Sequence, residues 1–233
     1  MTKTYLFIGG SYGIGKEILP LLPSDAKVIV ASRTREGLEG ENIQHIPFDV
    51  LTDTLPIEQL PSQLDGFVYC PGSINLRPFR GLKEEAFKND FEINVLGAVR
   101  TLQQIQPLLT ASEQASVVLF STVAVQTGMP FHASVAASKG ALEGLGRSLA
   151  AEWAPKVRVN VIAPSITDTP LANRFLNNDA KKEKAALRHP LKRIGTTKDV
   201  AQLAAFLLSE NSSWMTGQVL GLDGGMSSLN VSG

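Results

Sequence analysis

A lysine and two residues shortly before it are the positions of this sequence that most specifically indicate chemistry. The stretch FHASVAASKGALEGL, residues 131–145, has apolar and small residues at helical spacing. Lys139 and Val135 stand four residues apart and so share one face of that helix. His132 lies three residues before Val135, and an imidazole can supply a proton near neutral pH. Valine has no ionisable or hydrogen-bonding group, so it cannot take part in proton transfer.

A glycine-rich turn after the first apolar run indicates a phosphate-binding loop. In FIGGSYGIG the glycines follow a strand-like run and precede a helical one. Glycine lets the backbone approach a ligand closely, and N–H groups at a helix start can meet a pyrophosphate. A plain strand-to-helix turn is the alternative. The loop residues predicted to contact a cofactor are Gly9, Ser11, Tyr12, Gly13, Ile14 and Gly15.

The end of the second apolar run, VIVASRT, indicates which dinucleotide is bound. NAD-selective proteins commonly carry an acid here for the ribose hydroxyls, and this sequence has none. Arg33 offers a fork of N–H donors suited to a 2′-phosphate, and Ser32 and Thr34 add hydroxyl groups. We therefore expect NADP(H) to be preferred over NAD(H). An arginine that only faces solvent is the alternative.

The rest of the chain must position these residues, and its pattern is one of alternating strands and helices. Seven apolar, β-branched runs occur: TYLFIGG, AKVIVAS, IQHIPFDV, DGFVYCPG, ASVVLFST, VRVNVIAP and GQVLGLDGG. Because most are apolar on both faces, they predict an α/β fold with a Rossmann-type, doubly wound, parallel seven-stranded sheet. The longest helical patterns cover about 83–109 and 133–153. We expect a single domain over 1–233, with an irregular, charged substrate lid at about 165–195.

Composition and charge narrow the class of partner. Lys plus Arg and Asp plus Glu both number 22, and no block of like charges occurs. We therefore expect a small-molecule partner rather than nucleic acid or a membrane. Neither a signal-peptide pattern nor a membrane-length apolar run is seen, so a cytoplasmic location is expected. Cys70, a lone cysteine, is expected to be a small core residue, and with three scattered histidines no metal site is expected.

Taken together, these motifs resemble those of the classical short-chain dehydrogenase/reductase family, most closely its β-ketoacyl-acyl-carrier-protein reductase branch. The glycine loop fits the family pattern G-x-x-x-G-x-G, and the resemblance covers nearly the whole chain. It implies that Asn94, in FEINVLGAV, helps to hold a catalytic Lys139 and a proton-relay water. It also implies a homotetramer packed through the two long helices. Further positions that match cofactor-contacting residues of the family are Asp49, Val50, Gly72, Pro164 and Thr169, and Asn160 belongs to the same motif as the last two.

The departures from the family pattern fall at the catalytic positions. Val135 occupies the position of the family's tyrosine, and Thr122 occupies that of its serine, thirteen residues earlier. Loss of a general acid slows a reaction by about 10²- to 10⁴-fold. Three side chains are candidates to replace it: Thr122, Tyr69 at the end of the fourth run, and His132. His132 stands seven residues before Lys139, where enoyl reductases of the superfamily have their tyrosine.

The sequence therefore predicts an NADP(H)-dependent oxidoreductase that reduces a carbonyl, or oxidises an alcohol, by hydride transfer with an atypical proton donor. Two alternatives stay open: a non-catalytic NADP(H)-binding sensor or partner protein, and a reductase of an activated C=C bond. The joint presence of Asn94, Thr122 and Lys139 favours the first, since a purely structural descendant has little reason to keep all three.

Overall fold

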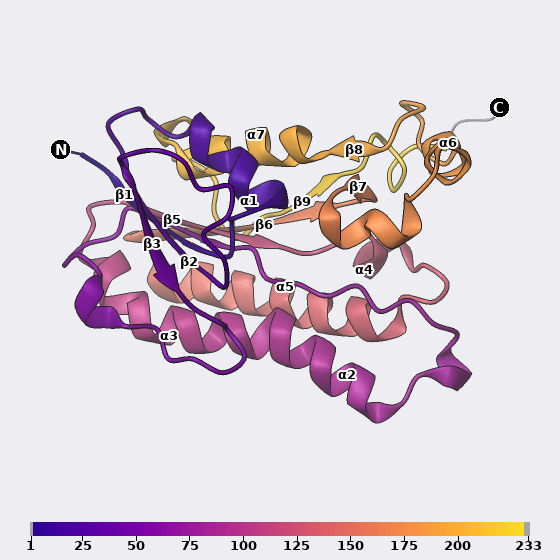
Figure 1. Cartoon of the computed structure of the whole chain (residues 1–233), viewed down its shortest axis with the longest axis horizontal. Coiled ribbons are helices and arrows are strands. Elements are labelled where there is room, and N and C mark those ends of the chain that lie inside the picture. Colours follow the sequence, from indigo (N-terminus) through magenta and orange to yellow (C-terminus); the bar gives the residue numbers. More distant parts are fainter. Residues whose placement is uncertain (1, 231–233) are drawn as a thin grey trace.

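A parallel sheet forms the centre of the molecule, in a computed structural model that describes residues 2–230. Its seven strands lie in the order β3-β2-β1-β4-β5-β6-β9, and each pairs with its neighbours in parallel (Figure 1). The predicted seven-stranded, Rossmann-type sheet is confirmed. The strand order reverses between β1 and β4, where ligands bind in folds of this kind. The strands are β1 (Thr4–Ile8), β2 (Lys27–Ser32), β3 (Ile43–Pro47), β4 (Gly66–Tyr69), β5 (Ala115–Phe120), β6 (Val157–Pro164) and β9 (Val219–Leu222).

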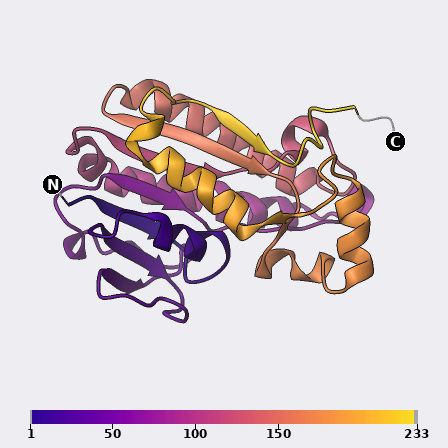
Figure 2. The ribbon, with the colours of Figure 1, turned by 90° about the horizontal axis from the view of Figure 1, so that it is seen from above.

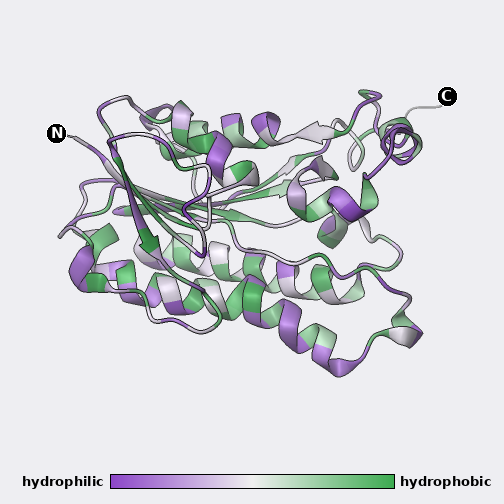
Figure 3. Cartoon of the chain, in the orientation of Figure 1, coloured by the Kyte–Doolittle hydropathy of each residue, from purple (hydrophilic) through white to green (hydrophobic). Residues whose placement is uncertain are grey.

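Helices cover both faces of the sheet because its inner strands are apolar on both sides (Figures 1 and 3). In β1, Leu6 and Ile8 pack into one core with α3 and α5, whereas Tyr5 and Phe7 pack into a second core with α1 and α7. No helix within residues 2–230 is both long and apolar enough to cross a membrane. The α-helices are α1 (Gly13–Ile18), α2 (Glu84–Phe91), α3 (Gly97–Thr110), α4 (Ala124–Thr127), α5 (Ala133–Trp153), α6 (Asp179–Leu187) and α7 (Thr197–Leu208).

The helical pattern predicted at about 83–109 is interrupted by one π-helical turn, Glu92–Leu96, between α2 and α3. A π turn inserts one extra residue into the helix and is often found at functional sites. Asn94 lies in this turn and is fully buried. Hydrophobic periodicity did not predict the interruption, because the apolar pattern was judged over the whole segment and a local shift by one residue does not break it.

The predicted lid segment, about 165–195, has regular structure over more than half of its length, so the prediction that it is irregular was wrong in that part. It contains the short pair β7 (Thr167–Asp168) and β8 (Gly195–Thr196), the 3₁₀ helix η5 (Pro170–Phe175) and α6. The side chain of Asn178 accepts a hydrogen bond from Lys181 N (2.9 Å) and so caps α6. Helix α6 buries no residue, so its sequence has no apolar stripe to reveal it. The segment lies beyond the carboxyl ends of the strands (Figure 2).

Helix α5 lies close to the sheet because it has a glycine at the contact. A Cβ atom placed on Gly146 would lie 2.8 Å from Cγ2 of Val161 in β6, which is closer than real Cβ atoms come. Gly140, on the same helix, has room, because a Cβ there would lie 3.5 Å from Val125 Cγ1. The small residue at 146 therefore sets the distance between the catalytic helix and the sheet.

We predict opposite effects for alanine at these two glycines. Gly146→Ala should lower the free energy of unfolding by about 1–2 kcal/mol, because the added methyl overpacks the buried contact with β6. Gly140→Ala should raise it by about 0.5–1 kcal/mol, because alanine is the better helix former. Urea denaturation of the two variants and the native protein measures both changes. Equal changes at the two positions would contradict this account of the packing.

Candidate active site

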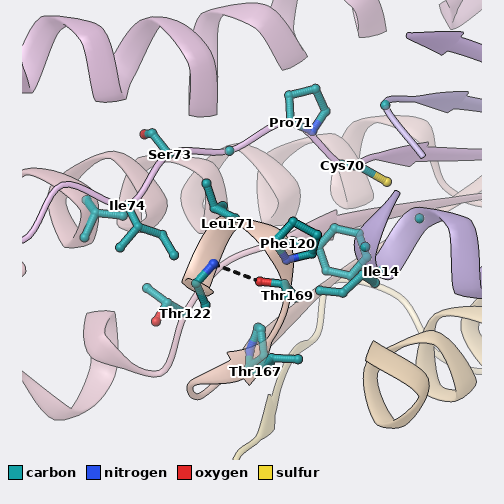
Figure 4. Close-up of a pocket in the computed structure, with 18 of the residues that line it drawn as sticks. Ile14, Cys70, Pro71, Ser73, Ile74, Phe120, Thr122, Thr167, Thr169 and Leu171 are labelled. Carbon is teal, nitrogen blue, oxygen red and sulfur yellow. Dashed lines mark hydrogen bonds between the residues drawn. The ribbon is translucent and has the colours of Figure 1, made fainter. Parts of the chain in front are cut away.

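One large cavity of about 750 Å³ opens at the carboxyl ends of the strands. It is bounded by the glycine loop, by the segments that follow β2, β4, β5 and β6, and by the lid (Figure 4). Nearly all of the sequence-predicted site residues line it, from Gly9 at one end to Lys139 at the other; Asn94 lies just behind its wall. The cavity therefore brings together residues that are far apart in the sequence.

The glycine loop has the close backbone approach that a dinucleotide site needs. Gly9 and Gly13 have φ angles of 75° and 64°, which are unfavourable for other residues. A Cβ on Gly15 would lie 2.5 Å from Gly10 Cα and 2.8 Å from the sulfur of Cys70. Only glycine fits there, so the start of α1 can face a pyrophosphate directly.

The segment after β2 forms the adenosine end of the cavity, with Arg33 at its rim. The Arg33 guanidinium lies 3.4 Å from the hydroxyl of Tyr12, and Arg33 has no ion pair among the described residues. Ser32 is less available than predicted, because its hydroxyl donates to Thr34 O (2.8 Å). The Thr34 hydroxyl lies 3.2 Å from that of Ser11 and joins this segment to the glycine loop.

Asp49 and Val50 line the same end of the cavity. The Asp49 carboxylate accepts a hydrogen bond from Leu51 N (3.0 Å), which shapes the turn after β3, and Val50 is buried. The turn thus presents one carboxylate and one apolar side chain where the family resemblance expects an adenine.

Lys139 lies at the other end of the cavity and is almost completely buried. Its ammonium donates a hydrogen bond to Phe120 O (2.7 Å), and a Cβ on Gly72 would lie 3.5 Å from Nζ. Burial lowers the pKa of Lys139 to about 8, although the nearby Asp90 carboxylate opposes the shift. The protonation state of Lys139 therefore changes close to physiological pH.

Asn94 belongs to a buried hydrogen-bond network just behind Lys139. Its amide nitrogen donates to the hydroxyls of Ser73 (2.9 Å) and Ser138 (3.1 Å). Ser73 and Ser134 in turn donate to the two oxygens of Asp90, each at 2.6 Å. The network joins the loop after β4, the π turn and the catalytic helix, so these parts are positioned together.

Sequence reasoning missed four members of this network: Ser73, Asp90, Ser134 and Ser138. One signal was available, because Asp90 stands four residues before Asn94 and so falls on the same helix face. A carboxylate and an amide that share a buried face need partners, and nearby hydroxyls are suitable donors.

Three residues at the start of α5 line the cavity: His132, which is the N-cap, and Val135 and Lys139 within the helix. Val135 is buried, and its side chain brings no hydroxyl to this part of the cavity. The Nδ1 atom of His132 lies 2.8 Å from Pro130 O, and its Nε2 atom has no hydrogen-bond partner among the described residues. Thr122 also lines the cavity, at the end of β5 (Figure 4).

Two sequence hypotheses are not supported by the geometry. Tyr69 does not line the cavity; its hydroxyl donates to Ile93 O (2.6 Å), and burial raises its pKa well above the usual range. It is therefore neither a replacement proton donor nor a wall of the adenosine site. Asn160 is buried and bonds to the backbone of Met215 and Gln218, so it joins β6 to the segment before β9 instead of contacting a cofactor.

Cys70 lines the cavity beside the glycine loop, with its thiol enclosed. Burial raises the pKa of this thiol to about 12, so it stays protonated and is a poor nucleophile. The expectation of a small core residue is met only in part, because Cys70 is half-buried and lines the cavity while it packs against the core beneath α1 and α7.

The segment at 165–195 contacts the opposite wall of the cavity and is also held by bonds within itself. The Arg174 guanidinium donates to Ile74 O in the loop after β4. Near the end of α6, buried His189 lies 2.9 Å from the Ser165 hydroxyl and 2.8 Å from Ala185 O. Pro164 and Thr169, the predicted cofactor contacts of this region, both line the cavity.

A parallel sheet with a glycine loop after its first strand, and with a buried lysine on a helix across the same cavity, defines a Rossmann-fold oxidoreductase that binds a nicotinamide cofactor. Residues 56–227 match the family model described as Enoyl-(Acyl carrier protein) reductase. The chain belongs to the short-chain dehydrogenase/reductase family.

Individual relatives and solved structures agree with this family. The 3-oxoacyl-[acyl-carrier-protein] reductase FabG of Thermotoga maritima is 30% identical, with 96% of this chain and 97% of that protein covered. A short chain dehydrogenase family protein from Francisella tularensis superposes with a TM-score of 0.89 at 27% identity, covering 98% of this chain and 100% of the other. The structure of ElxO with NADP bound superposes with a TM-score of 0.88 at 27% identity, covering 98% of this chain and 100% of the other.

The buried ammonium of Lys139 should cost stability, and we predict that Lys139→Met makes the protein more stable at pH 7. A free lysine has a pKa of about 10.4, so below pH 8 the lowered pKa corresponds to a penalty of up to about 3 kcal/mol. Between pH 8 and about 10.4 the unfolded chain binds more protons than the folded one, so native stability rises with pH.

The advantage of Lys139→Met should therefore shrink as the pH increases from 7 to 10, as measured by urea denaturation at both values. Lys198→Met, at an exposed position on α7, is the control and should show the same small difference at both pH values. An effect of Lys139→Met that does not change with pH would contradict the burial of a charged lysine.

Proposed function

We propose that this protein is an NADP(H)-dependent oxidoreductase that reduces a carbonyl, or oxidises an alcohol, with His132 as its proton donor. The observation that carries the proposal is the single cavity that joins Arg33 and the glycine loop to Thr122, His132 and Lys139. When bound, the cofactor supplies or accepts the hydride. The residues of the chain bind it, orient the substrate and move the proton.

NADP(H) fits the adenosine end of the cavity because Arg33 is free to meet an extra phosphate there. The guanidinium is exposed at the rim and offers paired N–H donors. At the end of β2, where NAD-selective proteins place an acid, the cavity is lined by Ser32. The NADP-bound ElxO structure supports the same choice.

The cofactor preference can be tested at Arg33. Arg33→Gln should weaken NADPH binding by about 10- to 100-fold, because a charge-assisted hydrogen bond to phosphate is lost, and should leave NADH binding nearly unchanged. Arg35→Gln is the control, since Arg35 is close in sequence but does not line the cavity. Dissociation constants follow from the fluorescence of the bound nicotinamide. An equal loss of NADPH and NADH affinity would contradict a phosphate contact.

In the proposed reaction, the hydroxyl of Thr122 donates a hydrogen bond to the substrate oxygen, and the ammonium of Lys139 favours negative charge nearby. The Nδ1–H of His132 donates to Pro130 O, which leaves Nε2 to carry the transferred proton. In reduction, the imidazolium gives this proton to the oxygen as the carbonyl carbon receives hydride. In oxidation, the neutral ring accepts the proton from the alcohol.

A set of four proteins tests the role of His132: the native protein, His132→Gln, Val135→Tyr and the double variant. His132→Gln should lower NADPH oxidation with ketones and aldehydes by about 10²- to 10⁴-fold, the usual worth of a general acid. The double variant should regain activity, because a phenol one turn before Lys139 replaces the imidazole. NADPH affinity, measured for each protein, should not change.

Full activity of His132→Gln would contradict the assigned role. If only the variants that contain tyrosine are active, the protein is instead a non-catalytic cofactor-binding protein on this scaffold, the alternative left open by its sequence.

Reduction of an activated C=C bond is a second candidate function, favoured by one specific observation. The matching family model carries the description Enoyl-(Acyl carrier protein) reductase. His132, seven residues before Lys139, lines the same cavity, where it can protonate a carbon or an enolate oxygen. Product analysis with an enone distinguishes a saturated ketone from an allylic alcohol. The lid at 165–195, the homotetramer and the cytoplasmic location stay predictions.

A further inference from the structure

The charged side chains that line the cavity are mostly positive, although the whole chain has equal numbers of acidic and basic residues. Asp49, at the adenosine end, supplies the one aspartate or glutamate carboxylate among the described lining residues. The lining lysines and arginines are Arg33, Lys139, Arg174, Lys181, Lys184 and Arg188. Four of these six lie in the lid, far along the chain from the cofactor motifs.

Three of the lid cations form a row on one face of α6. Lys181, Lys184 and Arg188 are spaced at i, i+3 and i+7, the spacing of a single helix face, and all line the cavity. The acidic residues of the helix, Asp179 and Glu183, do not line it. The helix therefore turns its positive face toward the cavity.

None of the three cations in this row has a charged partner among the described residues, and two of them have no side-chain partner at all. Lys181 donates to the Asn177 side chain (2.9 Å), but Lys184 and Arg188 make neither an ion pair nor a side-chain hydrogen bond there. They are four residues apart, so their like charges repel each other. By contrast Lys182, on the other side of the helix, pairs with Asp168 at 2.7 Å.

Arg174, the fourth lid cation, is already engaged. Its guanidinium donates to Ile74 O and lies 4.7 Å from the ring centre of Phe175. This contact joins the segment at 165–195 to the opposite wall. Lys184 and Arg188 line the cavity but stay exposed to solvent, so they can meet an anion at its mouth.

We infer that the substrate carries an anionic group, a carboxylate or a phosphate, which Lys184 and Arg188 hold at the lid. The inference rests on the proposed function for the reacting carbonyl or alcohol, which lies near Thr122. Arginine provides paired donors to the oxygens of the anion, and lysine adds a mobile charge. The cofactor's phosphates are the other possible anions, and they are expected at the glycine loop and Arg33.

Binding to protein saturated with NADP⁺ tests the inference without requiring turnover. The probes are para-acetylbenzoate, its uncharged methyl ester and para-acetylphenyl phosphate, measured by calorimetry. At least one anionic probe should bind about tenfold or more tightly than the ester, and added salt should reduce this preference. The preference should disappear in the double variant Lys184→Gln, Arg188→Gln. Comparing the two anions identifies which group the site accepts.

Lys182→Gln is the matched control, because it removes the same kind of charge from the same helix but outside the cavity. It should keep the preference for the anion. Failure of both anionic probes to bind more tightly than the ester, or a preference that survives the double variant, would overturn the inference. A loss of NADP⁺ affinity in the double variant as large as its loss of affinity for the anionic probe would also overturn the inference, because Lys184 and Arg188 would then bind the cofactor. A preference for the anion in a protein that reduces nothing leaves the anion site standing and refutes only the proposed reaction.

Discussion

The buried carboxylate of Asp90 is the constraint on which the geometry of the site depends. It accepts hydrogen bonds from Ser73, in the loop after β4, and from Ser134, at the start of α5. A buried carboxylate without partners is very costly, so both segments must lie where their hydroxyls reach it. Through Ser73 the network extends to Asn94 and then to Ser138. The loop, the π turn and the catalytic helix thus hold one another in place before any ligand binds.

The site combines this rigid support with a lysine that is unfavourable for stability. Lys139 loses hydration on burial, and Val135, one turn earlier, offers no hydroxyl in its place. Such a cost is common where function, and not packing, decides a residue. His132, the proposed proton donor, precedes the first residue of the same helix and lines the same cavity. It is more exposed than Lys139, so proton transfer at His132 would take place closer to solvent.

Local patterns predicted the scaffold, because a buried parallel strand is apolar on both faces and a phosphate loop needs glycine. The seven strands and the helix at 133–153 follow from such patterns. The direction of the Tyr69 phenol could not be predicted, since it depends on packing between β4 and the π turn. Ser73 and Asp90 likewise meet only in the folded chain. Helix α6 leaves no apolar stripe, and the cap at Asn178 was its one local signal.

In the contact between Arg174 and Ile74, the shape of the cavity and the attachment of the segment at 165–195 depend on different groups. The lid is held by the backbone carbonyl of Ile74, whereas the side chain of the same residue lines the cavity (Figure 4). Any residue at position 74 supplies that carbonyl. The size and shape of the cavity can therefore change through residue 74, in evolution or by design, while the attachment of the segment at 165–195 depends on Arg174.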